Sequence, residues 1–213
     1  MFKSTRLISV ATAVACGLSA CSVETEQVTR RDADYSTRLL TSLETSTYSG
    51  ADSTRAKPEP SEQSMNVYLT GYSYWDNTPR GSAQIARPVI HRSAGGTGTY
   101  DDPVTLAVGH IKTGTRSVMD YPAGTRFYIE KLRKYAIVED LCGDGNTPQY
   151  GPCHSGYQGH DWLDIYVGGR SVGEAHSDRC MYSITGIQNV ILNPQRGYEV
   201  HPGEISTSTC ATL

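Results

Sequence analysis

The chain has 213 residues, with 19 lysines and arginines against 22 acidic residues and a formal net charge of −3. This length is enough for one domain with a sizeable core and additional segments. A protein that tracks a phosphate backbone needs a basic stripe, and none occurs here, so the composition argues against a nucleic-acid binder.

The first twenty residues have the pattern of an export signal. Lys3 and Arg6 precede an apolar run, Leu7 to Ala20, that is too short to span a bilayer as a permanent helix. The sequence Leu18-Ser19-Ala20-Cys21 matches the lipobox at which bacterial signal peptides are cut before a lipidated cysteine. We therefore expect a signal peptide over residues 1–20 and lipidation of Cys21, which would hold an exported protein on a membrane of the cell envelope.

Ordinary secretion is the alternative, with processing at Arg30 and Arg31 and no lipid. Cleavage of the signal peptide removes two bases and no acids, so 19 and 22 become 17 and 22, a net charge near −5. Residues 21–65 are rich in Ser, Thr, Glu and Arg and end near KPEPSEQ, which predicts a disordered tether.

Residues 66–213 predict a single all-β domain, most simply a small closed or nearly closed barrel, and we expect a monomer. A Gly-rich loop is expected over one end, and only Val172–Asp178 has a briefly helical pattern. The predicted strands are Val67–Trp75, Val104–Gly109, Arg126–Glu130, Tyr135–Asp140, Trp162–Val167, Tyr182–Thr185 and Asn189–Leu192.

Four cysteines remain outside the export signal, an even number that implies disulfides in an exported chain. Three pairings are open, and we favour Cys142 with Cys153 and Cys180 with Cys210. No two cysteines have CxxC spacing and the histidines show no HxxxH or HExxH spacing, so we expect no metal and no cofactor.

Two predicted strands, YAIVED and WLDIYVGG, each carry a carboxylate among apolar residues. Alternation places Trp162, Asp164 and Tyr166 on one side of the second strand, and Val138 and Asp140 on one side of the first. If the strands are near each other, Asp140 and Asp164 line one cleft. Aromatic neighbours suit carbohydrate binding and a raised pKa of Asp164.

The strings DYPAGTRFYI, YAIVED and WLDIYVGG resemble the 3D-type and rare lipoprotein A-like domains, and more distantly expansins and family 45 endoglucanases. The resemblance covers most of residues 67–194 and implies a six-stranded double-psi β-barrel. It places Asp140 at the end of the strand before the variable loop, and Asp164 at the general-acid position. Tyr74-Trp75-Asp76 resembles the Tyr-Trp-Asp of family 45, where the Asp is the base.

The chain also departs from these families. The Ala-Val-Asp of 3D proteins is Ala107-Val108-Gly109 here, so one acid is missing, and Asn77-Thr78-Pro79 follows Asp76 where family 45 has cysteines. Asp-Asn-Thr-Pro is also ordinary turn chemistry, which gives Asp76 a structural alternative.

The function expected from these residues is cleavage of glycosidic bonds in a cell-wall polysaccharide, with peptidoglycan as one substrate. Asp164 would be the acid, with Asp140 and Asp76 as partners, in a hydrolase or a lytic transglycosylase. Aromatic side chains are the candidates for binding the sugar: Trp162, Tyr166, Tyr74 and Trp75. Two alternatives remain: a non-catalytic, expansin-like binding module, or a secreted cysteine-protease inhibitor with an ordered loop near Gly95 or Pro148.

Overall fold

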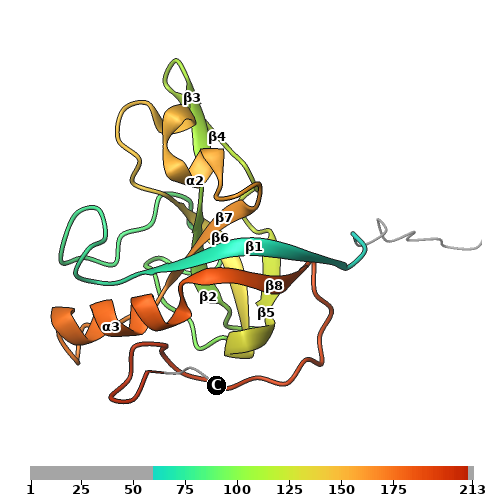
Figure 1. The fold of residues 1–213 in the computed structure, drawn as a ribbon, viewed down its shortest axis with the longest axis vertical. Helices are drawn as coiled ribbons and strands as arrows, with labels where there is room; N and C mark the ends of the chain where they lie inside the picture. Colours follow the sequence, from blue (N-terminus) through green and yellow to red (C-terminus); the bar gives the residue numbers. More distant parts are fainter. Residues whose placement is uncertain (1–59, 211–213) are drawn as a thin grey trace, which may run out of the picture. The chain divides into compact units, whose positions relative to one another are not determined.

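The computed structural model describes residues 60–210, and within them six strands close into a barrel (Figure 1). Around the barrel the order is β1-β7-β2-β6-β5-β8. The strands are β1 (Gln63–Tyr72), β2 (Val104–Val108), β5 (Arg126–Ile129), β6 (Lys134–Leu141), β7 (Asp161–Tyr166) and β8 (Gly186–Leu192). The all-β prediction is therefore confirmed at the level of a closed six-stranded barrel.

Two of the strand pairs are parallel and four are antiparallel. β1 runs parallel to β7 and β2 runs parallel to β6, whereas β1–β8, β2–β7, β5–β6 and β5–β8 are antiparallel. Each parallel partner lies far along the chain, because a parallel pair cannot be joined by a tight hairpin. Long connections therefore leave the barrel, and one of them is the segment between β1 and β2.

The barrel interior is filled by alternate residues of these strands, as the period of two requires. Fully buried examples on the four neighbouring strands β1, β7, β2 and β6 are Leu69, Leu106, Val138, Leu163 and Ile165. The residues between them face outward, where loops and helices cover them. The candidate site lies on this outer face.

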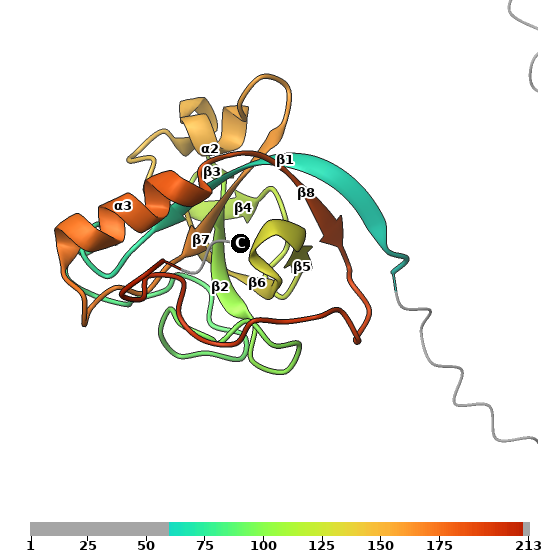
Figure 2. The same cartoon turned by 60° about the horizontal axis from the view of Figure 1, so that its bottom comes forward.

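Short elements surround the barrel. A hairpin, which the sequence pattern did not predict, is formed by β3 (His110–Thr113) and β4 (Arg116–Met119). It lies at the same end of the molecule as α2 (Pro152–Ser155), as the two views show (Figures 1 and 2). Two 3-10 turns complete the set, η1 (Glu130–Leu132) and η2 (Pro148–Tyr150).

Helix α3 (Glu174–Ile184) corrects one predicted strand. The predicted helix Val172–Asp178 overlaps its first half, but the predicted strand Tyr182–Thr185 is wrong, because Tyr182 to Ile184 form the last turn of α3. Ser177, Cys180 and Ile184 are buried at helical spacing, so packing on the barrel overrides the strand preference of the aromatic and β-branched residues.

Both favoured disulfides are present. Cys142 is bonded to Cys153 across the loop between β6 and β7, and Cys180 is bonded to Cys210, which ties the C-terminal segment to α3. The first bridge holds the loop beside the end of β6, where the candidate site begins.

The predicted signal peptide, Cys21 and most of the predicted tether lie outside the described residues. The tether was predicted to end at residue 65, but β1 begins at Gln63, so the folded part starts three residues earlier. Among residues 60–210 no helix is long and apolar enough to cross a membrane.

Candidate carboxylate site on the barrel

Asp140 and Asp164 are brought together by the register of three strands. Ala107 of β2 is the partner of Asp140 on β6 and of Asp164 on β7. Directly opposed residues of neighbouring strands share a face, so the two carboxylates flank one alanine. The methyl group of Ala107 leaves open space between them.

A register shift in β6 decides which acid faces this space. Leu106 pairs with Val138, but Ala107 pairs with Asp140, so Glu139 is skipped. Such bulges re-aim side chains, and here Val138 joins the core while Asp140 faces outward. The prediction that Val138 and Asp140 share one side is therefore wrong, because strict alternation does not continue through the bulge.

A pocket of about 450 Å³ lies over this row, and all three predicted acids border it: Asp76, Asp140 and Asp164. Its walls come from β1, β2, β6 and β7, from the segment between β1 and β2, and from the start of the disulfide loop after β6. The other lining residues are Tyr72, Asn77, Thr78, Gln84, Ile85, Ala86, Ala107, Leu141, Cys142 and Gly143. We name this pocket the carboxylate pocket.

Asp164 is the carboxyl group of the pocket whose raised pKa suits it to act as an acid. The residue is half-buried, and burial is the main cause that raises its pKa to about 7. Thr70 on β1 donates a hydrogen bond of 2.6 Å to Asp164 Oδ1, which acts in the opposite direction, while the charges of Asp76 and Asp140 raise the pKa further. Asp164 is therefore protonated in a large fraction of molecules at neutral pH.

Trp162 is linked to Asp164 through the same hydroxyl. Its indole Nε1 donates to Thr70 Oγ1 over 2.7 Å, so the hydrogen of Thr70 is free to point at Asp164. The ring of Tyr68 meets Trp162 edge to face, at 4.7 Å between centroids. The predicted placement of Trp162 beside Asp164 is thus confirmed.

Asp140 is buried, and both of its carboxylate oxygens accept hydrogen bonds. Its Oδ1 accepts hydrogen bonds of 2.9 Å from the backbone amides of Ala86 and Leu141, and its Oδ2 accepts one of 3.0 Å from Tyr72. Burial raises the pKa of Asp140, whereas these three hydrogen bonds lower it. Burial and the charge of Asp140 raise the pKa of Tyr72 well above its usual value, so the phenol stays a donor.

Asp76 combines a turn role with a place in the pocket. Its Oδ1 accepts from Ser73, over 2.6 Å from the backbone amide and 2.8 Å from the hydroxyl. The residue is exposed, and its Oδ2 makes no hydrogen bond to residues 60–210. The structural alternative for Asp76 is therefore present, and one oxygen remains free beside the pocket.

The predicted sugar-binding aromatics do not form one platform, and none of the four borders the carboxylate pocket. Tyr74 and Tyr166 line a second pocket of about 320 Å³, where the guanidinium of Arg170 lies over the Tyr74 ring. Trp75 donates its indole nitrogen to the Gly169 carbonyl over 3.0 Å.

Gly109 stands where the resemblance leads one to expect an acid, and its surroundings explain the glycine. A Cβ at this position would lie 2.6 Å from the His154 amide nitrogen and 2.7 Å from the Cys153 carbonyl carbon, and would also meet the Asp120 carboxylate. The disulfide loop therefore packs directly on the end of β2. An acid at position 109 would displace that loop.

Sequence reasoning missed Thr70 and Glu139, and it considered Tyr72 only as a sugar-stacking residue and not as a partner of Asp140. Thr70 and Tyr72 are ordinary strand residues by pattern, and only the pairing of β1 with β7 brings them to the acids. Glu139 is fully buried and stands in an apolar run, and a buried acid needs partners. The place of Glu139 in an apolar run was the signal from which the sequence could have identified it.

One group of metal-type ligands occurs within residues 60–210, namely His176, Cys180 and Cys210. The two cysteines are bonded to each other, so they offer no thiolate to an ion. The carboxylate pocket is separate from this group.

Comparison with known proteins gives one family. The DDB_G0273701 N-terminal domain matches residues 64–211, which is the barrel with its surrounding elements. A Dictyostelium discoideum protein, named only as the uncharacterized protein DDB_G0273701/DDB_G0273221, is 30% identical over 142 residues, which cover 65% of this chain and 55% of the relative. No solved structure matches. The chain belongs to the DDB_G0273701 N-terminal domain family.

Proposed function

We propose that this is an exported protein whose carboxylate pocket cleaves glycosidic bonds of a cell-wall polysaccharide, with Asp164 as the acid. The observation that carries the proposal is a half-buried carboxyl with a pKa of about 7 that shares a pocket with two further carboxylates. Perturbed acids in a cleft are typical of catalytic sites.

The proposed fold is a double-psi barrel. A closed barrel of six strands with two parallel pairs, β1–β7 and β2–β6, is compatible with that topology. The strings around Asp140 and Asp164 support the same assignment by resemblance. Fold alone does not carry an activity, so the chemistry is argued from the pocket.

In the proposed reaction the Asp164 carboxyl donates its proton to the glycosidic oxygen as the bond from that oxygen to the anomeric carbon breaks. Thr70 donates to Oδ1, which leaves Oδ2 to carry the transferred proton. The departing alcohol takes the proton, and positive charge develops on the sugar. Neighbouring carboxylates stabilise that charge.

The acceptor of the sugar distinguishes two outcomes. The free Oδ2 of Asp76 is suited to take a proton from water, and the product would then be a hydrolysed reducing end. If a hydroxyl of the substrate attacks instead, the product is an anhydro-sugar and the enzyme is a lytic transglycosylase. Asp140, with both oxygens bonded, is proposed to act through its charge.

A non-catalytic binding module is the second candidate, and one observation favours it. Gly109 leaves the acid set of the 3D-type domains incomplete. Such a module, like an expansin, would bind polysaccharide without releasing sugars. The protease-inhibitor alternative is the third candidate: Pro148 itself is buried, but Thr147 and Tyr150 in the same loop are exposed.

Export is part of the proposal and is supported by the two disulfides, which are typical of oxidising compartments. Lipidation of Cys21 and anchoring to a membrane remain predictions. The Dictyostelium relative comes from a eukaryote, which favours ordinary secretion over a bacterial lipoprotein route.

The test compares purified wild type with Asp164→Asn on peptidoglycan and on β-1,4-glucans, with the released sugars identified by mass spectrometry. Anhydro-muropeptides would show a transglycosylase and reducing ends a hydrolase, and Asp164→Asn should lose this release. Asp178→Asn, on α3 and outside the carboxylate pocket, is the matched control and should keep it.

If wild type releases nothing from either polymer, catalysis is refuted, and co-sedimentation with the same polymers decides for or against the binding module. If Asp164→Asn still inhibits a papain-type protease as well as wild type does, the inhibitor alternative replaces both.

A further inference from the structure

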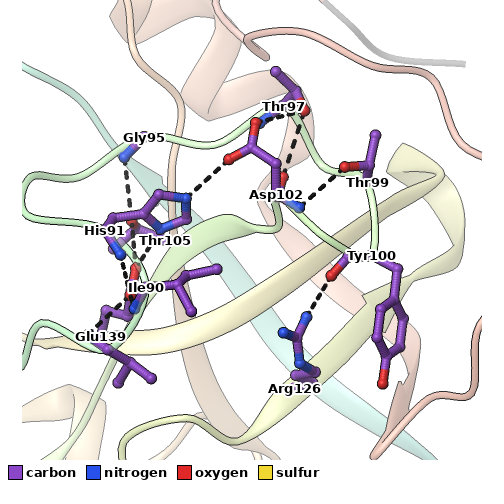
Figure 3. Close-up of polar contacts among 11 residues, drawn as sticks. Ile90, His91, Gly95, Thr97, Thr99, Tyr100, Asp102, Thr105, Arg126 and Glu139 are labelled. Carbon is purple, nitrogen blue, oxygen red and sulfur yellow. Dashed lines mark hydrogen bonds and ion pairs between the residues drawn. The ribbon is translucent and has the colours of Figure 1, made fainter.

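Glu139, the neighbour of Asp140 on β6, binds residues 89–91, which follow the Gln84–Ala86 wall of the carboxylate pocket. Figure 3 shows the contacts of Glu139 with Ile90 and His91. Its side chain is fully buried. Oε1 accepts three backbone hydrogen bonds, from Val89 over 3.1 Å, from Ile90 over 2.7 Å and from His91 over 2.9 Å. Oε2 lies 2.6 Å from His91 Nδ1 and accepts a longer bond from Thr105.

The other ring nitrogen of His91 faces a second carboxylate. Nε2 lies 2.9 Å from Asp102 Oδ1, while Asp102 Oδ2 accepts from the amide and hydroxyl of Thr97 (Figure 3). An ionised carboxylate only accepts hydrogen bonds, so both contacts are satisfied only when both ring nitrogens carry a hydrogen. The geometry therefore requires an imidazolium.

The charges around His91 agree with this protonation state. Burial acts to lower the pKa of His91, but hydrogen bonds and charges of Asp102 and Glu139 outweigh it, and the pKa is raised. These two acids, from the segment before β2 and from β6, are the charged groups that act on the ring. Arg87, in the same segment, donates its guanidinium to the carbonyl of Ala86.

The same segment is held by Asp140 a few residues earlier. Ala86 donates its amide to Asp140, and Arg87 donates its amide to the Glu139 carbonyl over 2.8 Å. Because of the bulge, Glu139 and Asp140 both face this segment. Gln84, Ile85 and Ala86 form one wall of the carboxylate pocket, so the anchor at residues 89–91 begins three residues after that wall.

We propose that His91, in its doubly protonated form, is a positioning residue that holds the Gln84–Ala86 wall of the carboxylate pocket against β6. It acts through Glu139 and Asp102 and touches no substrate. The inference rests on the proposed function only for what the pocket does, since the anchoring itself is independent of any ligand.

The consequence is a pocket that depends on pH. A raised pKa in the folded protein means that the His91 contribution is complete below the unfolded value of about 6.5 and is lost as pH rises through the folded pKa. Asp164 is also protonated below about pH 7. At mildly acidic pH, the Gln84–Ala86 wall is therefore held in place and Asp164 is protonated at the same time.

The test uses Asp102→Asn, which removes one charge from the partly exposed end of the network, and Asp101→Asn as the matched control. Asp101 is the neighbouring residue, is exposed, and pairs with Arg196 outside the network. In wild type we expect 15N NMR at pH 6.5, where an ordinary histidine is half-protonated, to show more than half of His91 with both nitrogens protonated. Amide hydrogen-exchange protection of Val89, Ile90 and His91 should fall through the His91 titration midpoint.

Asp102→Asn should shift that midpoint to lower pH and shift the loss of amide protection with it, whereas Asp101→Asn should shift neither. A His91 titration midpoint at or below the ordinary value of about 6.5, or amide protection that does not change through that midpoint, would overturn the proposal. If wild type cleaves a glycan, Asp102→Asn should also move the alkaline limb of the pH–rate profile to lower pH. If no glycan is cleaved, the proposed function fails while the NMR result still decides the role of His91.

Discussion

Asp140 and Asp164 have a common neighbour in the sheet, because Ala107 is the register partner of both. One of the two is locked by three hydrogen bonds and the other accepts a single one from Thr70 among residues 60–210. The environments of two neighbouring carboxyls thus differ, which is how paired acids acquire separate roles.

Asp164 should reduce the stability of the folded protein at neutral and alkaline pH. Its pKa is near 4 in an unfolded chain and about 7 in the folded one, so the folded state alone holds the proton between these values. Stability then falls as pH rises, by a total of up to about 4 kcal/mol over three units. Asp164→Asn should remove this fall.

Urea unfolding of wild type and Asp164→Asn from pH 4 to pH 8 measures this fall in stability. The variant should be close to wild type at pH 4 and the more stable of the two at pH 8. A constant difference across the range would show that Asp164 titrates as an ordinary surface carboxylate.

Thr70→Val should raise the pKa of Asp164 further. The substitution keeps the shape of the side chain but removes the hydroxyl that favours the charged carboxylate. Trp162 Nε1 also loses its acceptor, which should cost about 1–3 kcal/mol of unfolding free energy. Carboxyl NMR titration and urea unfolding check the two parts, and Thr185→Val, at the end of α3, is the control that should leave Asp164 unchanged.

Gly109→Ala should destabilise the protein by about 1–3 kcal/mol, because overpacked sites force the backbone to move. The backbone of Cys153 and His154 occupies the space of the new methyl group. Gly95→Ala is the matched control, since the nearest atom to its Cβ would be 3.9 Å away. Equal unfolding midpoints for the two variants would contradict the close approach at position 109.

The two disulfides should differ in what they support. Loop-closure entropy gives about 3 kcal/mol for the bridge that spans 11 residues and slightly more for the one that spans 30. The double variant Cys142→Ser with Cys153→Ser should also alter the pKa of Asp164, because Cys142 borders the carboxylate pocket. Cys180→Ser with Cys210→Ser should lower only the unfolding midpoint. An unchanged Asp164 titration in the first variant would refute the pocket role of that loop.

Much of the barrel was predictable because its strands carry the period-two pattern between clear turn residues. The predictions for β2, β5, β6 and β7 lie within one or two residues of the observed strands. Tyr182–Thr185 failed because aromatic and β-branched residues favour strands locally, and only the barrel surface makes them helical. The β3–β4 hairpin was not predicted because its strands are short and its only fully buried residue is His110.

The acidic residues of the site could be predicted from the sequence, but the residues that surround them could not. Asp76, Asp140 and Asp164 could be chosen because each stands in a motif, and the structure places all three around one pocket. Trp75 was chosen because it precedes Asp76 and Tyr166 because it shares a strand face with Asp164, but neither borders that pocket. The bulge at Glu139 and the His91 network depend on contacts between distant segments, for which a single sequence carries no signal.

The proposed chemistry depends on the Asp164 carboxyl, and its titration is the most direct measurement of it. Carbon NMR of wild type, with Asp164→Asn used to assign the signal, should give a pKa of about 7. A value near 4, as in an unfolded chain, would mean that Asp164 is ionised at neutral pH and would contradict its role as the acid.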